Sequence, residues 1–141
     1  LSCEAREAGS FLSSIAKYYS NTNKSLAFIA GGETVVHVKG NGLGGRNQEL
    51  ALASAIGIAD LKNVAIFSVG SDGTDGPTDA AGGYVDSNTQ NVLESKGINI
   101  YRVLENNDAY HGLLACDGLI KTGPTGTNVN DLSVLLIKGK L

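Results

Sequence analysis

Three loops in this sequence mix glycine with charged and polar residues, and each loop follows an apolar stretch. They occupy residues 39–49, 70–83 and 122–131. Glycine lets the backbone approach a ligand closely, while Arg, Asp, Asn and Thr supply charge and hydrogen bonds. In open α/β sheets, ligands bind beyond the carboxyl ends of the strands. We therefore expect the three loops to meet at one rim of a sheet and to form a polar basin for an anionic ligand.

The first loop combines glycines, an arginine and the expected start of a helix. Gly44 and Gly45 precede Arg46, and Asn47 is a good N-cap for a helix over residues 48–58. A helix N-terminus offers free N–H groups and a positive dipole end, and a guanidinium can hold a phosphate or carboxylate through two parallel hydrogen bonds. We interpret this loop as an anion site, against the simpler alternative of a flexible turn with a solvated arginine.

The same loop also matches a dinucleotide-binding pattern. Gly40, Gly42 and Gly45 satisfy a literal GxGxxG, and Asp72 lies about where such a fold places its ribose-binding acid. A nicotinamide-dependent oxidoreductase therefore stays open as an alternative. Against it, the fingerprint belongs on the first strand of such a domain, whereas two strand-like segments precede it here.

The second loop places three carboxylates close together, at Asp72, Asp75 and Asp79. Carboxylate oxygens suit Mg²⁺, and a carboxylate can also accept the proton of a substrate hydroxyl, as the base does in kinases. The alternative is that each aspartate caps a turn. We expect Asp72 to be functional, Asp72 and Asp75 to be candidate Mg²⁺ ligands, and Asp79 to cap the segment that follows it.

Hydroxyl, amide and backbone N–H groups dominate the third loop. Such a loop can hold phosphate or sugar oxygens, and a long structureless loop is uncommon unless it is functional. The alternative is a self-bonded surface turn. Together with Glu33, which follows Gly31-Gly32, the three loops provide a set of candidate substrate- or phosphate-binding residues: Glu33, Gly44, Gly45, Asn47, Asp75, Thr125, Asn128 and Asp131.

Apolar periodicity and turn residues predict the elements that must position these loops. Helices are expected over residues 3–19, 48–58, 88–95 and 109–116, the last after an N-cap cluster at 106–108. Strands are expected over residues 26–30, 34–38, 64–69, 84–85, 119–121 and 132–137. Alternating strands and helices predict an α/β fold, a layered helix-sheet-helix domain with a mixed, mostly parallel, Rossmann-like sheet.

Composition narrows the functional classes. The 141 residues fit one domain, and 42% hydrophobic residues argue against disorder. A net charge of −3 without a Lys/Arg cluster argues against nucleic acid, and no apolar run is long enough to span a membrane. Two isolated cysteines indicate a reducing, cytoplasmic setting. The oligomeric state stays open, with a homodimer as one option.

Four segments of the sequence, the three loops and the segment around Glu33, together resemble the signature set of the MOFRL domain. They are residues 31–35, 42–49, 72–82 and 122–131, in that order. The opening segment 3–7 is similar to the one that precedes this domain in the family, with Cys3 in place of the usual glycine. The resemblance covers nearly the whole chain.

This resemblance implies the C-terminal domain of a two-domain glycerate kinase, which uses ATP to phosphorylate D-glycerate, usually at the 2-hydroxyl. It implies an active site in a cleft against an N-terminal domain that supplies a lysine, with Arg46 and Asp72 as the catalytic residues of this chain and Mg²⁺ as cofactor. Residues 1–20 would form a helix that links to that domain, and residues 21–141 would form the MOFRL domain. Some family members carry the label hydroxypyruvate reductase.

We also expect the chain to be a fragment. It contains no methionine, even at position 1, and a helical pattern is already under way in residues 1–8. Because phosphoryl transfer depends on positioning and charge, a chain that lacks one wall of the cleft is expected to be inactive by itself.

Overall fold

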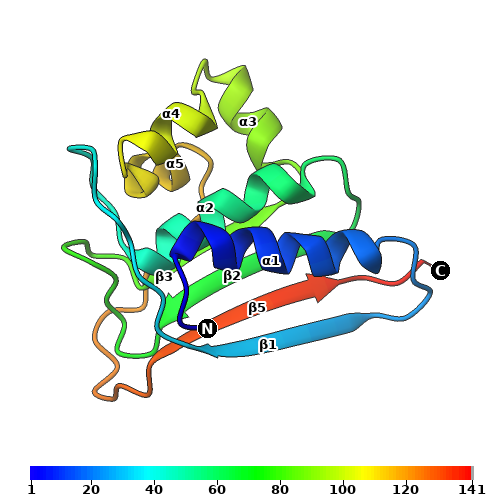
Figure 1. The fold of residues 1–141 in the computed structure, drawn as a ribbon, viewed down its shortest axis with the longest axis horizontal. Helices are drawn as coiled ribbons and strands as arrows, with labels where there is room; N and C mark the ends of the chain where they lie inside the picture. Colours follow the sequence, from blue (N-terminus) through cyan, green and yellow to red (C-terminus); the bar gives the residue numbers. More distant parts are fainter. Residues whose placement is uncertain (141) are drawn as a thin grey trace.

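Two helices form the layer that covers the sheet (Figure 1). The computed structural model describes residues 1–140. α1 (Ala5–Tyr18) packs on α2 (Arg46–Ile58), and a Cβ on Gly9 would lie only 2.6 Å from the carbonyl oxygen of Leu50. α2 is buried along most of its length because it lies between α1, the sheet and the shorter helices. The apolar stripe of α1 has helical spacing and consists of Ala5, Ala8, Leu12 and Ala16.

Five strands form one sheet in the order β1-β5-β2-β3-β4. They are β1 (Leu26–Gly32), β2 (Val64–Gly70), β3 (Gly82–Asp86), β4 (Leu119–Ile120) and β5 (Asp131–Ile137). Burial alternates along β1 and β2, as expected for a sheet covered on one face. Strand β5 is rich in apolar residues and lies between β1 and β2, and its Leu135 and Ile137 belong to the hydrophobic core.

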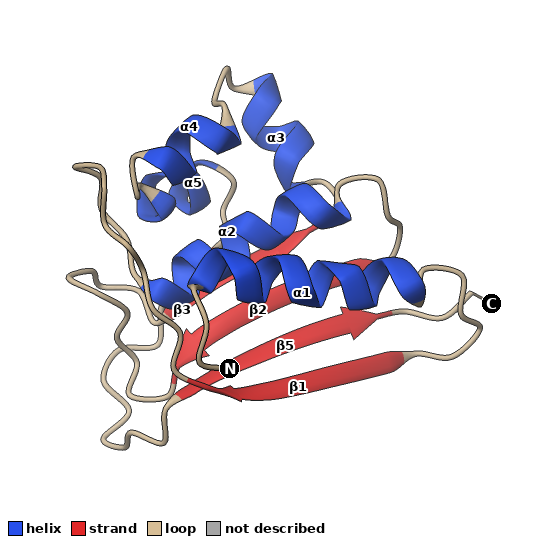
Figure 2. Cartoon of the chain, viewed as in Figure 1, coloured by secondary structure: helices blue, strands red, loops and turns tan. Residues whose placement is uncertain are grey.

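Three short helices follow β3 and pack around α2 (Figure 2). They are α3 (Thr89–Ser95), α4 (Ile100–Glu105) and α5 (Ala109–Ala115). α4 was not expected from the sequence, although its N-cap is a clear one: the side chain of Asn99 accepts hydrogen bonds from two backbone N–H groups of the first turn. Within residues 1–140, no helix combines the length and the apolar character needed to cross a bilayer.

The α/β class is confirmed, but the expectation of a mostly parallel, Rossmann-like sheet is wrong. Every pair of neighbouring strands is antiparallel. The β1-α2-β2 connection does leave β1 and β2 pointing the same way, as a strand-helix-strand unit predicts. The last strand, β5, then inserts between them in the opposite direction. As a result, Gly32, Gly70 and Asp131 lie side by side at one rim of the sheet.

The helix-sheet-helix layering is also wrong, because the helices lie on one face of the sheet (Figure 1). On the other face, Ile29, Leu132 and Leu136 remain exposed. The strand expected over residues 34–38 does not form. Instead, the chain there pairs only briefly with the N-terminal segment, through an isolated bridge between Glu4 and Val35.

The helix expected as a link to another domain is α1, and it is part of the packed unit. Ala8 and Leu12 are almost fully buried, and the Ser13 hydroxyl donates to the carbonyl oxygen of Ser54 on α2. Residues 5–18 therefore share the core of the sheet layer.

Two neighbouring leucines of β5 test this arrangement. Leu135 is fully buried, whereas Leu136 is 41% exposed on the opposite face. Leu135→Ala should lower the free energy of unfolding of the 141-residue chain by about 2–5 kcal/mol, because it leaves a cavity in the core. Leu136→Ala is the matched control and should cost less than about 1 kcal/mol. Urea denaturation measures both, and equal losses would contradict the assigned faces.

Candidate functional site

The second and third loops contact each other at the rim of the sheet. The Thr125 hydroxyl donates to the carbonyl oxygen of Ser71 at 2.5 Å, and the Ser71 hydroxyl accepts from the backbone N–H of Val129 at 2.7 Å. Asn128 donates from Nδ2 to the carboxylate of Asp72 at 3.2 Å. Thr125 and Asn128, which were predicted to bind phosphate, are therefore engaged in holding the loop that carries Asp72.

The first loop is tied to the second through Asp75, which is 3% exposed. Its Oδ1 accepts from the backbone N–H and the Nδ2 of Asn47, and its Oδ2 accepts from the backbone N–H of Gln48 at 2.8 Å. Burial raises the pKa of Asp75, and these hydrogen bonds oppose that shift. Asp75 thus caps α2 from another loop, and two of the N–H groups expected to bind an anion are occupied by a carboxylate of the protein itself.

Close packing explains the glycine before Arg46. Gly45, rather than Asn47, is the N-cap residue of α2. A Cβ on Gly45 would lie 2.4 Å from the carboxyl carbon of Asp75, so any side chain there would push the capping aspartate away. Asn47 is 1% exposed and its Oδ1 accepts from Ser68, so it cannot reach a ligand.

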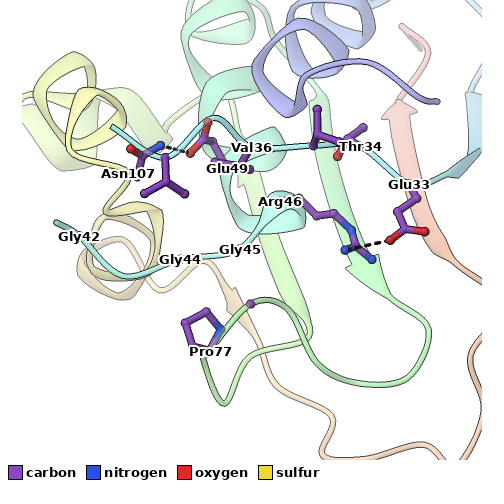
Figure 3. A pocket seen from close by; sticks show the side chains of 13 residues that line it. Glu33, Thr34, Val36, Gly42, Gly44, Gly45, Arg46, Glu49, Pro77 and Asn107 are labelled. Atoms are coloured by element: carbon purple, nitrogen blue, oxygen red, sulfur yellow. Dashed lines mark hydrogen bonds and ion pairs between the residues drawn. The ribbon is translucent and has the colours of Figure 1, made fainter. Parts of the chain in front are cut away.

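Arg46 forms the centre of an ion-pair group. Its Nε and Nη2 donate to the two carboxylate oxygens of Asp131 at 2.5 and 3.0 Å, and its Nη1 lies 3.3 Å from Oε1 of Glu33 (Figure 3). The hydrogen bond to Asp131 is the main reason that the pKa of Arg46 is raised. Arg46, Asp131 and Glu33, which were all predicted as site residues, are therefore brought together. Asp131, however, binds the arginine and is not free to bind a substrate.

Asp72 presents its carboxylate to solvent. Its Oδ1 accepts from the backbone N–H of Thr74 at 2.9 Å and from the Thr74 hydroxyl at 3.0 Å. These bonds, the backbone one first, lower the pKa of Asp72, and the positive charge of Arg46 lowers it further. Asp72 is consequently a carboxylate at neutral pH, and it lies within the electrostatic reach of Arg46.

A cavity of about 710 Å³ opens between the glycine loop and the segment after β1. Arg46 and Glu33 lie at one end of it, Pro77 lies on one side, and Glu49 and Asn107 lie deeper (Figure 3). This volume falls in the range of small-molecule sites.

A buried polar network supports this cavity, and sequence reasoning did not include it in the site. Glu49 is 2% exposed, and it accepts from Nε of Arg6 at 2.7 Å and from Nδ2 of Asn107 at 3.1 Å. Asn107 also accepts from the backbone N–H groups of Lys39 and Gly40, so it clamps the glycine loop. The Asn-Asn-Asp segment that was expected only to cap a helix was the available signal, because asparagine tolerates the positive φ of 53° that Asn107 adopts.

A Mg²⁺ site shared by Asp72 and Asp75 does not fit this geometry. Both oxygens of Asp75 already accept hydrogen bonds from α2 in a buried position. In the described part of the chain, no group of three or more His, Cys, Asp or Glu residues is placed to hold a metal ion. Asp72 keeps an exposed carboxylate, and Mg²⁺ that arrives with nucleotide phosphates needs only one or two protein carboxylates.

Fold and site together define an α/β domain that carries an arginine held by Asp131 and a separate, partly exposed carboxylate, Asp72, at the same rim of the sheet. The chain belongs to the MOFRL family, whose sequence profile matches residues 26–131. The D-glycerate 2-kinase of Thermotoga maritima is 56% identical over an alignment of 141 positions, which covers 97% of this chain and 34% of the relative. The glycerate 2-kinase of Pyrococcus horikoshii is 42% identical over 97% of this chain and 32% of its own length.

Comparison of structures agrees with comparison of sequences. The crystal structure of the Thermotoga maritima glycerate kinase has a TM-score of 0.91 over 97% of this chain and 34% of that one, at 55% identity. The chain therefore spans about a third of the length of the relatives it matches.

The capping role of Asp75 can be measured. Asp75→Ala leaves buried N–H groups of α2 without a partner, so the free energy of unfolding should fall by at least about 1–2 kcal/mol. Asp79→Ala is a control on the same loop, since Asp79 forms an exposed pair with Lys121 instead of the expected cap, and it should cost less than about 1 kcal/mol. Chemical denaturation of both variants checks the difference, and a neutral Asp75→Ala would refute the cap.

Proposed function

We propose that this chain is the C-terminal part of a glycerate kinase that transfers the γ-phosphoryl group of ATP to D-glycerate, giving 2-phosphoglycerate. The observation that carries the proposal is that a guanidinium fixed by Asp131, that of Arg46, and a partly exposed, ionised carboxylate, that of Asp72, both lie at one rim of the sheet. The names of the Thermotoga and Pyrococcus relatives support it, since both are glycerate 2-kinases.

In this proposal Arg46 stabilises negative charge. Phosphoryl transfer places charge on the equatorial oxygens of the moving group, and catalysis depends on positioning and on electrostatic stabilisation. The guanidinium is 37% exposed at the end of the cavity, so it can contact either the transferring phosphoryl group or the carboxylate of glycerate.

Asp72 is assigned the substrate hydroxyl. Thr74 occupies its Oδ1, while Oδ2 has only the weaker contact from Asn128 at 3.2 Å. A carboxylate with a lowered pKa is a weak base, so Asp72 orients the attacking hydroxyl as a hydrogen-bond acceptor better than it removes the proton early. The same oxygen could hold Mg²⁺, which would supply charge neutralisation for the phosphates of ATP.

The activity of the whole protein requires more chain than these 141 residues. The relatives are about three times as long, and the cavity is open at the rim. We propose that the remaining part of the longer protein closes the cleft and supplies a lysine. Glu33, Gly44 and Gly45 line this chain's side of the cavity, whereas Asn47, Asp75, Thr125, Asn128 and Asp131 support it.

An assay of the full-length protein separates the two candidate reactions. With D-glycerate and ATP it should form 2-phosphoglycerate, whereas hydroxypyruvate with NADH should give no oxidation of the nucleotide. The isolated 141 residues should show no turnover in either assay, because one wall of the cleft is missing. Reductase activity without kinase activity, or turnover by the isolated chain, would overturn the proposal.

Substitutions at the two assigned residues test their roles. In the full-length protein, Arg46→Ala and Asp72→Asn should each lower kcat/KM by about 10²–10³-fold, while Asp79→Asn should retain wild-type turnover. Because the hydrogen bonds from Thr74 lower the pKa of Asp72 from that of an ordinary aspartate, its active, ionised form persists further into acid than that of a free carboxyl group. The wild-type rate should therefore show no acid limb from Asp72 between pH 5 and 8. Such a limb, if Asp72→Asn abolished it, would contradict this assignment.

A further inference from the structure

We propose that the two carboxylates beside Arg46 have opposite roles. Asp131 is a positioning residue that fixes the guanidinium, and Glu33 is an exchangeable partner that an incoming oxyanion displaces. This inference deepens the proposed function and rests on it for the identity of the substrate. The displacement of Glu33 by an anion can nevertheless be measured by binding, without turnover.

The contact with Asp131 has the features of a permanent one. Its side chain is 7% exposed, and both carboxylate oxygens accept from the guanidinium. The backbone of Asp131 pairs with Gly32 on β1 and with Gly70 on β2, so the carboxylate is carried by a strand that is paired on both sides. Two parallel bonds from a rigid support fix both the position and the plane of the guanidinium.

The contact with Asp131 leaves the end of the guanidinium, formed by Nη1 and Nη2, available for an anion. A guanidinium has five N–H donors, and Asp131 takes the one on Nε and one on Nη2. Three donors remain, and they include the pair on Nη1 and Nη2 that forms the end-on fork. This fork can grip a carboxylate or a phosphoryl group through two parallel bonds.

Glu33 stands at that free edge and is held loosely. Its side chain is 60% exposed, and its contact with Arg46 is a single one of 3.3 Å to Nη1 (Figure 3). Exposed ion pairs of this kind contribute little stability, so the side chain can leave at small cost. An arriving oxyanion and the Glu33 carboxylate repel each other because both are negative. The loosely held Glu33 side chain then moves away, and the oxyanion takes its place on Nη1.

Asp131→Asn and Glu33→Gln in the full-length protein give a matched pair. Each variant removes one negative charge from Arg46, so net charge alone predicts the same change in both. Our proposal predicts opposite changes. Glu33→Gln should lower the KM of the oxyanion that uses the fork two- to fivefold. Asp131→Asn should raise that KM and lower kcat at least tenfold.

The KM values of the two substrates also identify the oxyanion that binds to the fork. If the fork holds the carboxylate of glycerate, the KM of glycerate shifts and that of ATP does not, and the reverse holds for the phosphoryl group. Asp131→Glu keeps the charge and should show a kcat between those of Asp131→Asn and wild type. If Asp131→Asn fails to fold, Asp131→Glu replaces it and must raise the KM that Glu33→Gln lowers. Shifts of the same sign in the two positions would overturn the proposal.

Calorimetric titration of the full-length protein separates this inference from the proposed function. Inorganic phosphate and D-glycerate are titrated separately into wild type, Glu33→Gln and Arg46→Lys. The anion that uses the fork should bind two- to fivefold more tightly to Glu33→Gln and at least fivefold more weakly to Arg46→Lys. This pattern in a protein without kinase activity would uphold the inference and reject the function. Equal affinities in wild type and Glu33→Gln would overturn the inference.

Discussion

The bidentate contact between Arg46 and Asp131 ties together the parts of this domain on which its site depends. Arg46 is the first residue of α2, and Asp131 is the first residue of β5, which lies between β1 and β2. The backbone of Asp131 joins β1 to β2, so the same residue defines the rim of the sheet and the plane of the guanidinium. The start of the buried helix is thereby fixed against the sheet at the point where the cavity opens.

The N-terminus of α2 illustrates how the charges are divided. A helix N-terminus with free N–H groups attracts anions, but here the buried carboxylate of Asp75 already accepts from two of these groups, on Asn47 and Gln48. Asp75 therefore stabilises the helix, and the attraction for an external anion passes to the Arg46 side chain. The ion pair with Asp131 fixes the orientation of the Arg46 guanidinium, whereas the helix dipole alone would attract an anion without fixing its position.

Much of the candidate site could be predicted from local sequence, because its residues follow strands in three glycine-rich loops. The convergence of those loops was expected because each one follows a predicted strand, and the structure brings them together because β1 and β2 point the same way. The roles of Asp75 and Asp131 depend on partners 28 and 85 residues away, which no local pattern contains. The antiparallel pairing was missed for the same reason, namely that it depends on a distant segment. β5 lies between β1 and β2, two strands that a helix connects, and the alternation of strands and helices in the sequence does not reveal this insertion.

In the kinase reaction that we propose, the charge balance at the rim is the reason that this chain would need a further part of the longer protein for catalysis. Among the residues that line the cavity, Arg46 is the one cation, and it is already shared between Asp131 and Glu33. Asp72 adds a further negative charge within its reach. ATP and glycerate bring several more, and two anions can meet for phosphoryl transfer only where their charge is neutralised. A cation-bearing wall from the rest of the longer protein, with Mg²⁺ on the nucleotide, would complete a site of which this domain supplies the arginine fork and the acceptor for the hydroxyl.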